Sequence, residues 1–115
     1  MTINETQNNA IICAKLNSTI TIELTDASLL GERWIMNASP GLRITDEGTT
    51  FYWYYMNGTP VTDKTYMGST MGHGIDRWNV TMTNTGIQTV NGTLQFYASN
   101  EPRNLKTLNW TIVVG

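Results

Sequence analysis

The fold is decided by residues 20–34, which read ITIELTDASLLGERW. From residue 20 to residue 24, apolar side chains alternate with threonine and glutamate, a pattern typical of a strand with one buried face. The loop that follows carries two bare leucines, Leu29 and Leu30, beside the flexible Gly31. Loops are ordinarily polar, so two interpretations stand: the leucines enter the cleft of a partner, or they fold back as a lid over the protein's own core.

The same period-two pattern recurs along the chain, and no segment has helical periodicity. Turn signals such as Asn57-Gly58 separate the alternating segments from one another. Seven or eight short strands predict an all-β antiparallel sandwich, with Trp34, Trp78 and Trp110 mostly buried. The segments with strand character are 10–15, 20–25, 33–36, 42–45, 51–56, 77–83, 90–96 and 107–114.

The chain has 115 residues and a formal net charge of −2, and we expect residues 10–115 to form one domain. Residues 1–9 are polar and aperiodic, so we expect them to be a disordered N-terminal arm. The absence of any Lys/Arg cluster argues against nucleic acid and anionic membranes as partners. No apolar run is long enough for a membrane span, and an exported form implies that a signal segment has been removed.

The sequence contains seven Asn-x-Ser/Thr sequons, against the roughly two or three that this composition gives by chance. Most of them fall at expected turns or on polar positions of strands, where a glycan is tolerated. The sequence therefore favours an extracellular or cell-surface glycoprotein, although Thr-rich strands also generate such triplets by composition. Besides Asn4 in the N-terminal arm, the candidate glycosylation sites are Asn17, Asn37, Asn57, Asn79, Asn91 and Asn109.

Residues suited to catalysis are scarce. Cys13 is the only cysteine, so no disulfide forms within the chain, and the apolar Ile11 and Ile12 before it predict a small buried thiol. A dyad of Cys13 with His73, the only histidine, would need a thiolate in apolar company, where it is disfavoured. The carboxylates are scattered, without the clustering of a metal site. We therefore expect no enzyme, no metal and no cofactor.

Glycine flanks His73 on both sides, in the sequence Met71-Gly72-His73-Gly74. Two interpretations are equally open. In the first, the glycines allow a tight turn with His73 as its exposed tip. In the second, the bare backbone approaches another chain and forms strand-like hydrogen bonds with it.

Three segments together carry a family resemblance. The first is the strand and loop of residues 20–34, with Gly31 and Trp34, which NASPGL follows at 37–42. The second is MGHG at 71–74, which precedes an expected strand with an aromatic residue at 75–80. The third is ASN at 98–100, which comes after an expected strand that ends in aromatic residues. This arrangement resembles the chagasin-type inhibitors of papain-like cysteine proteases over about residues 15–115. The family's usual Asn-Pro-Thr-Thr is replaced here by residues 27–30, and its Arg-Pro-Trp by residues 98–100.

The resemblance implies an immunoglobulin-like sandwich that acts as a reversible proteinaceous inhibitor, with a papain-like cysteine protease as partner. Three loops at one end would occlude the substrate cleft, and the chain would be a monomer. The alternative is a glycosylated surface or envelope module of the same fold that has lost inhibition and serves in adhesion or structure. The implied protease-binding residues are Ser28, Leu29, Leu30 and Gly31 in loop 1, Met71, Gly72, His73 and Gly74 in loop 2, and Ala98, Ser99 and Asn100 in loop 3.

Overall fold

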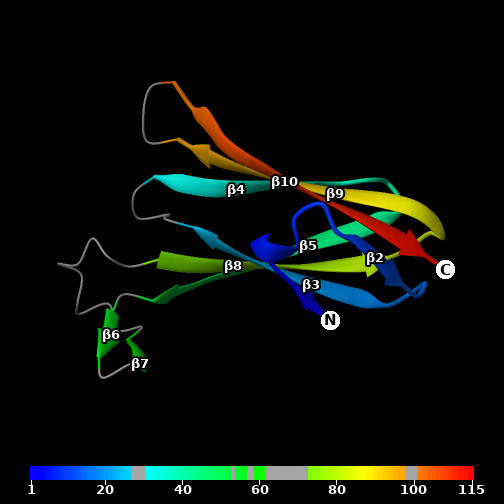
Figure 1. The fold of residues 1–115 in the computed structure, drawn as a ribbon, viewed down its shortest axis with the longest axis horizontal. Helices are drawn as coiled ribbons and strands as arrows, with labels where there is room; N and C mark the ends of the chain where they lie inside the picture. The colour runs from blue at the N-terminus through cyan, green and yellow to red at the C-terminus, as the bar shows by residue number, and fades with distance from the viewer. Residues whose placement is uncertain (27–30, 53, 57–58, 62–72, 98–100) are drawn as a thin grey trace.

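The structure is a computed structural model, and it describes residues 1–26, 31–52, 54–56, 59–61, 73–97 and 101–115. Figure 1 shows the arrangement of its strands. In chain order the elements are β1 (Thr2–Ile3), the short 3-10 helix η1 (Glu5–Gln7), β2 (Ile11–Ala14), β3 (Thr19–Asp26), β4 (Glu32–Ala38), β5 (Leu42–Tyr52), β6 (Tyr54–Met56), β7 (Thr59–Val61), β8 (His73–Met82), β9 (Gly86–Phe96) and β10 (Arg103–Val114).

Eight of these strands form two four-stranded sheets that face each other (Figure 1). Sheet A has the order β1-β3-β8-β5, and sheet B has the order β2-β10-β9-β4. Strands β6 and β7 form a separate two-stranded sheet. The all-β, immunoglobulin-like sandwich predicted from the sequence is confirmed. The pairings of β1 with β3 and of β2 with β10 are parallel, and the other pairings are antiparallel.

The core forms where the alternating strands turn their apolar phase inward. In β3, Ile20 is 2% exposed, and Ile22 and Leu24 are fully buried, while the residues between them face solvent at least in part. Strands β8, β9 and β10 alternate in the same way, so the two inner faces interlock as in other sandwiches. The predicted burial of the three tryptophans is confirmed, with exposed fractions of 7%, 6% and 1% for Trp34, Trp78 and Trp110.

The expected disordered arm at residues 1–9 is wrong in this structure. Ile3 has no exposed surface, and strand β1 pairs with β3 at Thr21 and Ile22. Asn4 then caps η1, and Asn8 accepts a hydrogen bond from the Asn109 backbone at 2.9 Å. A single buried apolar residue among polar ones gives no periodic signal, so the sequence pattern could not reveal this strand.

The predicted burial of Cys13 is also wrong. Strand β2 lies at the edge of sheet B, where only one side chain in two reaches the core. Ile12 is 5% exposed, whereas Cys13 is exposed and Ile11 is 72% exposed. Three apolar residues in a row therefore concealed the alternation.

Strand β5 is longer than predicted because its polar centre forms a bulge instead of a loop. The register with β8 shifts between Asp46 and Gly48, and Gly48 has a φ of +90°. The Asp46 carboxylate accepts a hydrogen bond from the Gly48 backbone N–H at 2.8 Å. Glycine adopts such a φ without strain, so the strand continues beyond residues 42–45 to Tyr52.

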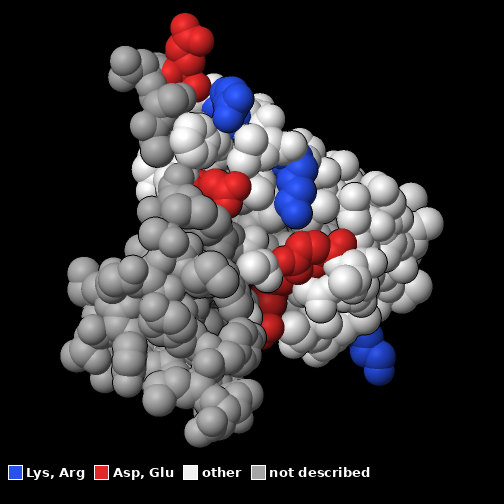
Figure 2. Space-filling view, turned by 60° about the vertical axis from the view of Figure 1, so that its left-hand side comes forward, with Lys and Arg blue, Asp and Glu red and all other residues white. Residues whose placement is uncertain are grey.

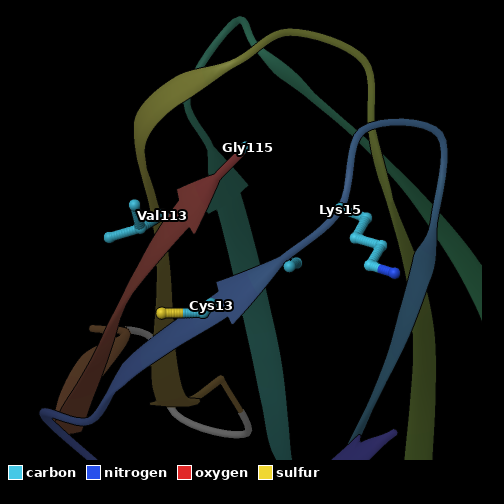
Figure 3. Close-up of a pocket in the computed structure, with 5 residues that line it drawn as sticks. Cys13, Lys15, Val113 and Gly115 are labelled. Atoms are coloured by element: carbon cyan, nitrogen blue, oxygen red, sulfur yellow. The ribbon is translucent and has the colours of Figure 1, made fainter.

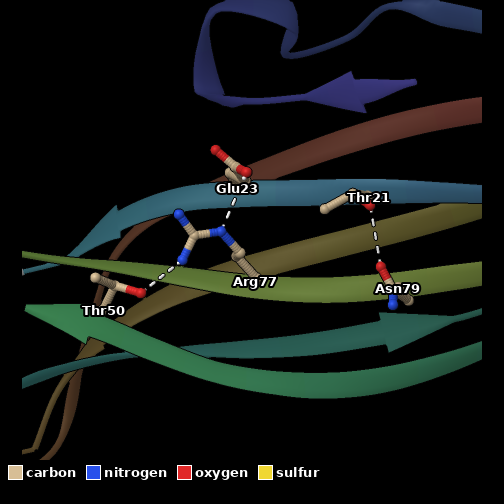
Figure 4. A network of polar contacts seen from close by, with 5 residues as sticks. All are labelled: Thr21, Glu23, Thr50, Arg77 and Asn79. Carbon is tan, nitrogen blue, oxygen red and sulfur yellow. Dashed lines mark hydrogen bonds and ion pairs between the residues drawn. The ribbon is translucent and has the colours of Figure 1, made fainter.

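The outer face of sheet A is bound together by polar contacts between strands (Figure 4). Arg77 of β8 donates to Glu23 of β3 at 3.2 Å and to Thr50 of β5 at 2.8 Å. Thr21 donates to the side-chain oxygen of Asn79 at 3.0 Å. These are partly exposed contacts, and the ion pair in particular contributes about 0–1 kcal/mol.

Candidate functional site

The strand ends that flank the three predicted loops meet at one end of the sandwich. Asp26, the last residue of β3, lies opposite Gly74 near the start of β8. Glu32 at the start of β4 and Arg103 at the start of β10 both lie opposite Phe96, the last residue of β9. Figure 1 shows these strand ends on the left, away from the C-terminus. We call this region the loop end.

The base of loop 1 is held by hydrogen bonds to both sheets. The indole Nε1 of Trp34 donates to the Thr25 carbonyl at 3.0 Å, which joins β4 to β3. The Thr25 backbone N–H donates to the Glu5 carboxylate at 2.7 Å. Gly31 is buried with a φ of +90°, and its carbonyl accepts from the Tyr97 N–H at 2.8 Å. Loop 1 therefore leaves the sandwich from two fixed points.

His73 and Gly74 of predicted loop 2 belong to a strand. His73 is the first residue of β8 and pairs with Tyr52, and Gly74 pairs with β3 and β5. Interpreting His73 as the tip of a tight turn is therefore wrong. Met71 and Gly72 lie outside the described residues. The sequence pattern could not show that β8 begins at His73, because the glycines on both sides of this residue interrupt the alternation.

Cationic side chains lie over aromatic rings around the base of loop 3. The guanidinium of Arg33 lies 5.1 Å from the Tyr97 ring centre, and it also donates to Gln95 at 2.8 Å. Arg103 lies 5.5 Å from the ring centre of Phe96. Such contacts contribute about 0.5–1 kcal/mol at exposed sites. They link β4 and β10 to the end of β9 at the base of loop 3, and the sequence pattern did not identify them.

A cavity of about 390 Å³ opens between the two sheets at the loop end. Asp76 lines it from β8, is 7% exposed and accepts a hydrogen bond from Thr49. Glu32 and Asp46 add two carboxylates against the one guanidinium of Arg33, so the lining is acidic. Figure 2 shows acidic and basic side chains close together on this side.

Asp76 is the site residue that the sequence analysis missed. It occupies a buried position of β8, between the buried Gly74 and Trp78, where alternation calls for an apolar side chain. An acidic residue on the buried phase of an otherwise regular strand was the signal that could have revealed it. Buried carboxylates need polar partners, and Thr49 on the neighbouring β5 supplies one.

The structure does not bring Cys13 and His73 together as a catalytic dyad. Strand β2, which carries Cys13, and the start of β8 at His73 lie at opposite ends of the sandwich (Figure 1). Among the described residues, no group of three or more His, Cys, Asp or Glu side chains is placed to hold a metal ion. The part of the chain that the structure describes has no helix long and apolar enough to cross a membrane.

The sequon asparagines have different surroundings. Asn37, Asn91 and Asn109 lie opposite one another on β4, β9 and β10, and all three are exposed. Asn17 is exposed in a turn with a φ of +67°, and Asn79 is half-buried. The predicted site residues that lie outside the described part of the chain, besides Met71 and Gly72, are Ser28, Leu29, Leu30, Ala98, Ser99, Asn100 and the sequon Asn57.

No protein-family model matches the chain, and no curated protein matches its sequence. Solved structures do match over nearly its whole length. The crystal structure of EhICP2, a cysteine protease inhibitor from Entamoeba histolytica, has a TM-score of 0.69 at 13% identity, and the match covers 99% of this chain and 93% of that one. The solution structure of amebosin has a TM-score of 0.63 at 18% identity and covers 99% and 96%. The chain thus shares the fold of a chagasin-type cysteine protease inhibitor.

Proposed function

We propose that the protein is a reversible inhibitor of papain-like cysteine proteases. The observation that carries the proposal is the meeting of the strand ends that flank loops 1, 2 and 3 at one end of a sandwich shared with EhICP2. We expect three loops that leave one end of such a sandwich to form a wedge that fits the open substrate cleft of the protease. A typical interface of this kind buries about 1,600 Å² in total.

The hydrogen bonds at the base of loop 1 support tight binding, because they reduce the conformational entropy that this loop loses when it binds. Every side chain that is ordered only on binding costs about 0.5–1.5 kcal/mol. Here the Trp34–Thr25 and Gly31–Tyr97 hydrogen bonds fix the base of loop 1 in the free protein. Leu29 and Leu30 then supply apolar surface for the cleft, and burial of each leucine contributes roughly 1.5–3 kcal/mol.

The proposed function is tested by titration of papain-like proteases with the purified protein at fixed substrate concentration. We expect competitive inhibition that is reversed by dilution, with the inhibitor recovered uncleaved. A serine protease in the same assay is the control and should be unaffected. The proposal is contradicted if no papain-like enzyme is inhibited at about 10 µM of the protein. This concentration exceeds the dissociation constants that are typical of an interface of this size.

The alternative function, a glycosylated surface module, is favoured by one observation. The three exposed asparagines Asn37, Asn91 and Asn109 form a row on the outer face of sheet B. Glycans there would cover that face and leave the loop end free. Expression in a eukaryotic secretory host followed by mass spectrometry of the peptides tests it. Modified sequons without protease inhibition would favour the surface module, and unmodified sequons would remove its support.

A further inference from the structure

The outer face of sheet B carries an apolar stripe at its β2 edge. Cys13 of β2, Val113 of β10 and Ile87 of β9 lie directly opposite one another, so they form one row across three strands. Ile11 lies two residues from Cys13 on the same face of β2. Ile11 and Ile87 are 72% and 75% exposed, Val113 is 37% exposed, and Cys13 is exposed. A contiguous exposed apolar patch that ends at a sheet edge indicates a contact surface.

The backbone of β2 is also unpaired on one side. The Thr111 N–H donates to the Ala10 carbonyl at 3.1 Å, and the Gly115 N–H donates to the Ala14 carbonyl at 3.0 Å. In a parallel ladder, alternate residues of a strand bond to the same neighbour, so the N–H and C=O groups of Ile11 and Cys13 point away from β10. In the described part of the chain, β2 pairs with β10 alone.

Edge strands are normally protected by charges, prolines or bulges. Strand β2 has none of these between Ile11 and Ala14, and the first charge is that of Lys15 beyond its end. A hollow of about 430 Å³ lies beside it, lined by Cys13, Ala14, Lys15, Val113 and Gly115. Figure 3 shows the Cys13 and Val113 side chains pointing to the same side, with Lys15 directed away from them. The edge therefore offers both hydrogen-bonding groups and apolar surface.

We propose that β2 pairs in antiparallel fashion with β2 of a second copy of this chain, about a two-fold axis at Ile12. In this register, Ile11 of one copy faces Cys13 of the other, so the outward N–H and C=O groups of both residues are satisfied on both sides. The Ile11 side chain then lies against the hollow beside Cys13 of the second copy, and the two apolar stripes become continuous. The two B sheets join into one.

We take the partner to be a second copy of the chain because the edge of β2 is complementary to the same edge of another copy. An isologous contact needs one surface that matches itself, and an uncharged strand with free groups at two alternate residues does so. A four-residue strand buries little area, so the dimer belongs to the weak class, with a dissociation constant roughly between 1 µM and 1 mM. Figure 1 shows β2 at the end of the sandwich opposite the loop end, so both loop ends stay accessible in the dimer.

Sedimentation equilibrium of the whole chain under reducing conditions tests the dimer at concentrations from about 1 µM to 1 mM, which span that range. We expect self-association, and the substitution Ile11→Lys should weaken it at least tenfold by placing a charge at the edge. Ile35→Lys is the matched control, because Ile35 is 36% exposed on the same face but lies on β4 at the other edge. A wild-type chain that stays monomeric, or equal effects of both variants, would overturn the proposal. If Ile11→Lys does not fold, Cys13→Arg tests the same edge.

A cross-linking experiment tests the register independently. Hydrogen-bonded antiparallel residues have Cα atoms about 5.5 Å apart, within the range of about 4.4–6.8 Å that a disulfide spans. The Ile11→Cys variant, oxidised by copper–phenanthroline, should form a covalent dimer in which position 11 of one copy is linked to Cys13 of the other. The same substitution in a Cys13→Ser background should cross-link at least fivefold less. Equal yields in the two backgrounds would contradict the register.

Discussion

Trp34 and Trp110 are both buried indoles, yet they differ in what their N–H group contacts. Trp34 donates to the Thr25 carbonyl, whereas Trp110, 1% exposed, has no hydrogen-bond partner for Nε1 among the described residues. A buried donor without a partner costs about 1–3 kcal/mol. The same indole group therefore stabilises the loop end at one position and is a cost to stability at the other.

The difference can be measured with benzothienylalanine, an isostere of tryptophan in which sulfur replaces the indole N–H. At Trp34 the replacement should lower the free energy of unfolding by about 1 kcal/mol, because the Thr25 carbonyl loses its donor. At Trp110 it should leave stability unchanged or raise it. Denaturant unfolding of the two proteins provides the measurement, and an equal loss at both positions would contradict this account.

Gly31 and Gly48 form a matched pair, because both have a φ of +90°. A side chain is strained at such a φ, so Gly31→Ala and Gly48→Ala should each cost about 1–2 kcal/mol of stability. Only Gly31 lies at the base of loop 1. Gly31→Ala should therefore also weaken protease inhibition, while Gly48→Ala should leave the inhibition constant unchanged. Thermal unfolding and inhibition assays on both variants check this, and parallel losses of inhibition would point to stability alone.

At the scale of elements, alternation predicted the strands because it reports directly which side chains are buried. The alternation pattern failed in strands where the apolar residues of the sequence do not correspond to the buried side chains. An edge strand buries one side chain in two even when three apolar residues follow one another, as in β2, and a glycine bulge lets a polar segment remain inside β5. The two-residue β1 is too short to show any period.

The candidate site was less accessible to sequence reasoning than the strands. Two bare leucines beside Gly31 marked loop 1, since apolar residues in a loop need an explanation. The contacts that hold the loop bases join residues far apart in the sequence, such as Glu5 with Thr25 and Arg33 with Tyr97. Pairings of that kind depend on strand register, which no local pattern contains.

Loop 1 yields a prediction that separates the two interpretations of its leucines. If Leu29 and Leu30 contact the protease, the double substitution Leu29→Ser and Leu30→Ser should weaken inhibition at least tenfold, or about 1.4 kcal/mol, with little change in Tm. If they cover the protein's own core, Tm should fall by several degrees and inhibition should persist. Inhibition and thermal unfolding measured on one protein decide between them, and we expect the first result.

For the whole molecule, the N-terminal residues contribute to both stability and the loop end. Deletion of residues 1–9 removes Ile3 from the core and the Glu5 carboxylate from the Thr25 N–H. We expect a loss of about 2–5 kcal/mol from the buried isoleucine and weaker inhibition in addition. Ile3→Ala should reproduce the loss of stability, and Thr2→Ala, at an exposed position, is the control. A deletion variant with wild-type Tm would show that this segment contributes nothing.

The pairing of residue 11 with residue 111 also has a consequence for synthesis of the chain. Strand β2 leaves the ribosome about 100 residues before its partner β10. Contacts between such distant residues require the closure of a long loop, which slows folding. The uncharged β2 segment therefore stays unpaired until β10 has been made, and during that interval its exposed edge is available to chaperones and to neighbouring chains. Because β10 lies between β2 and β9, its synthesis is the step that completes sheet B.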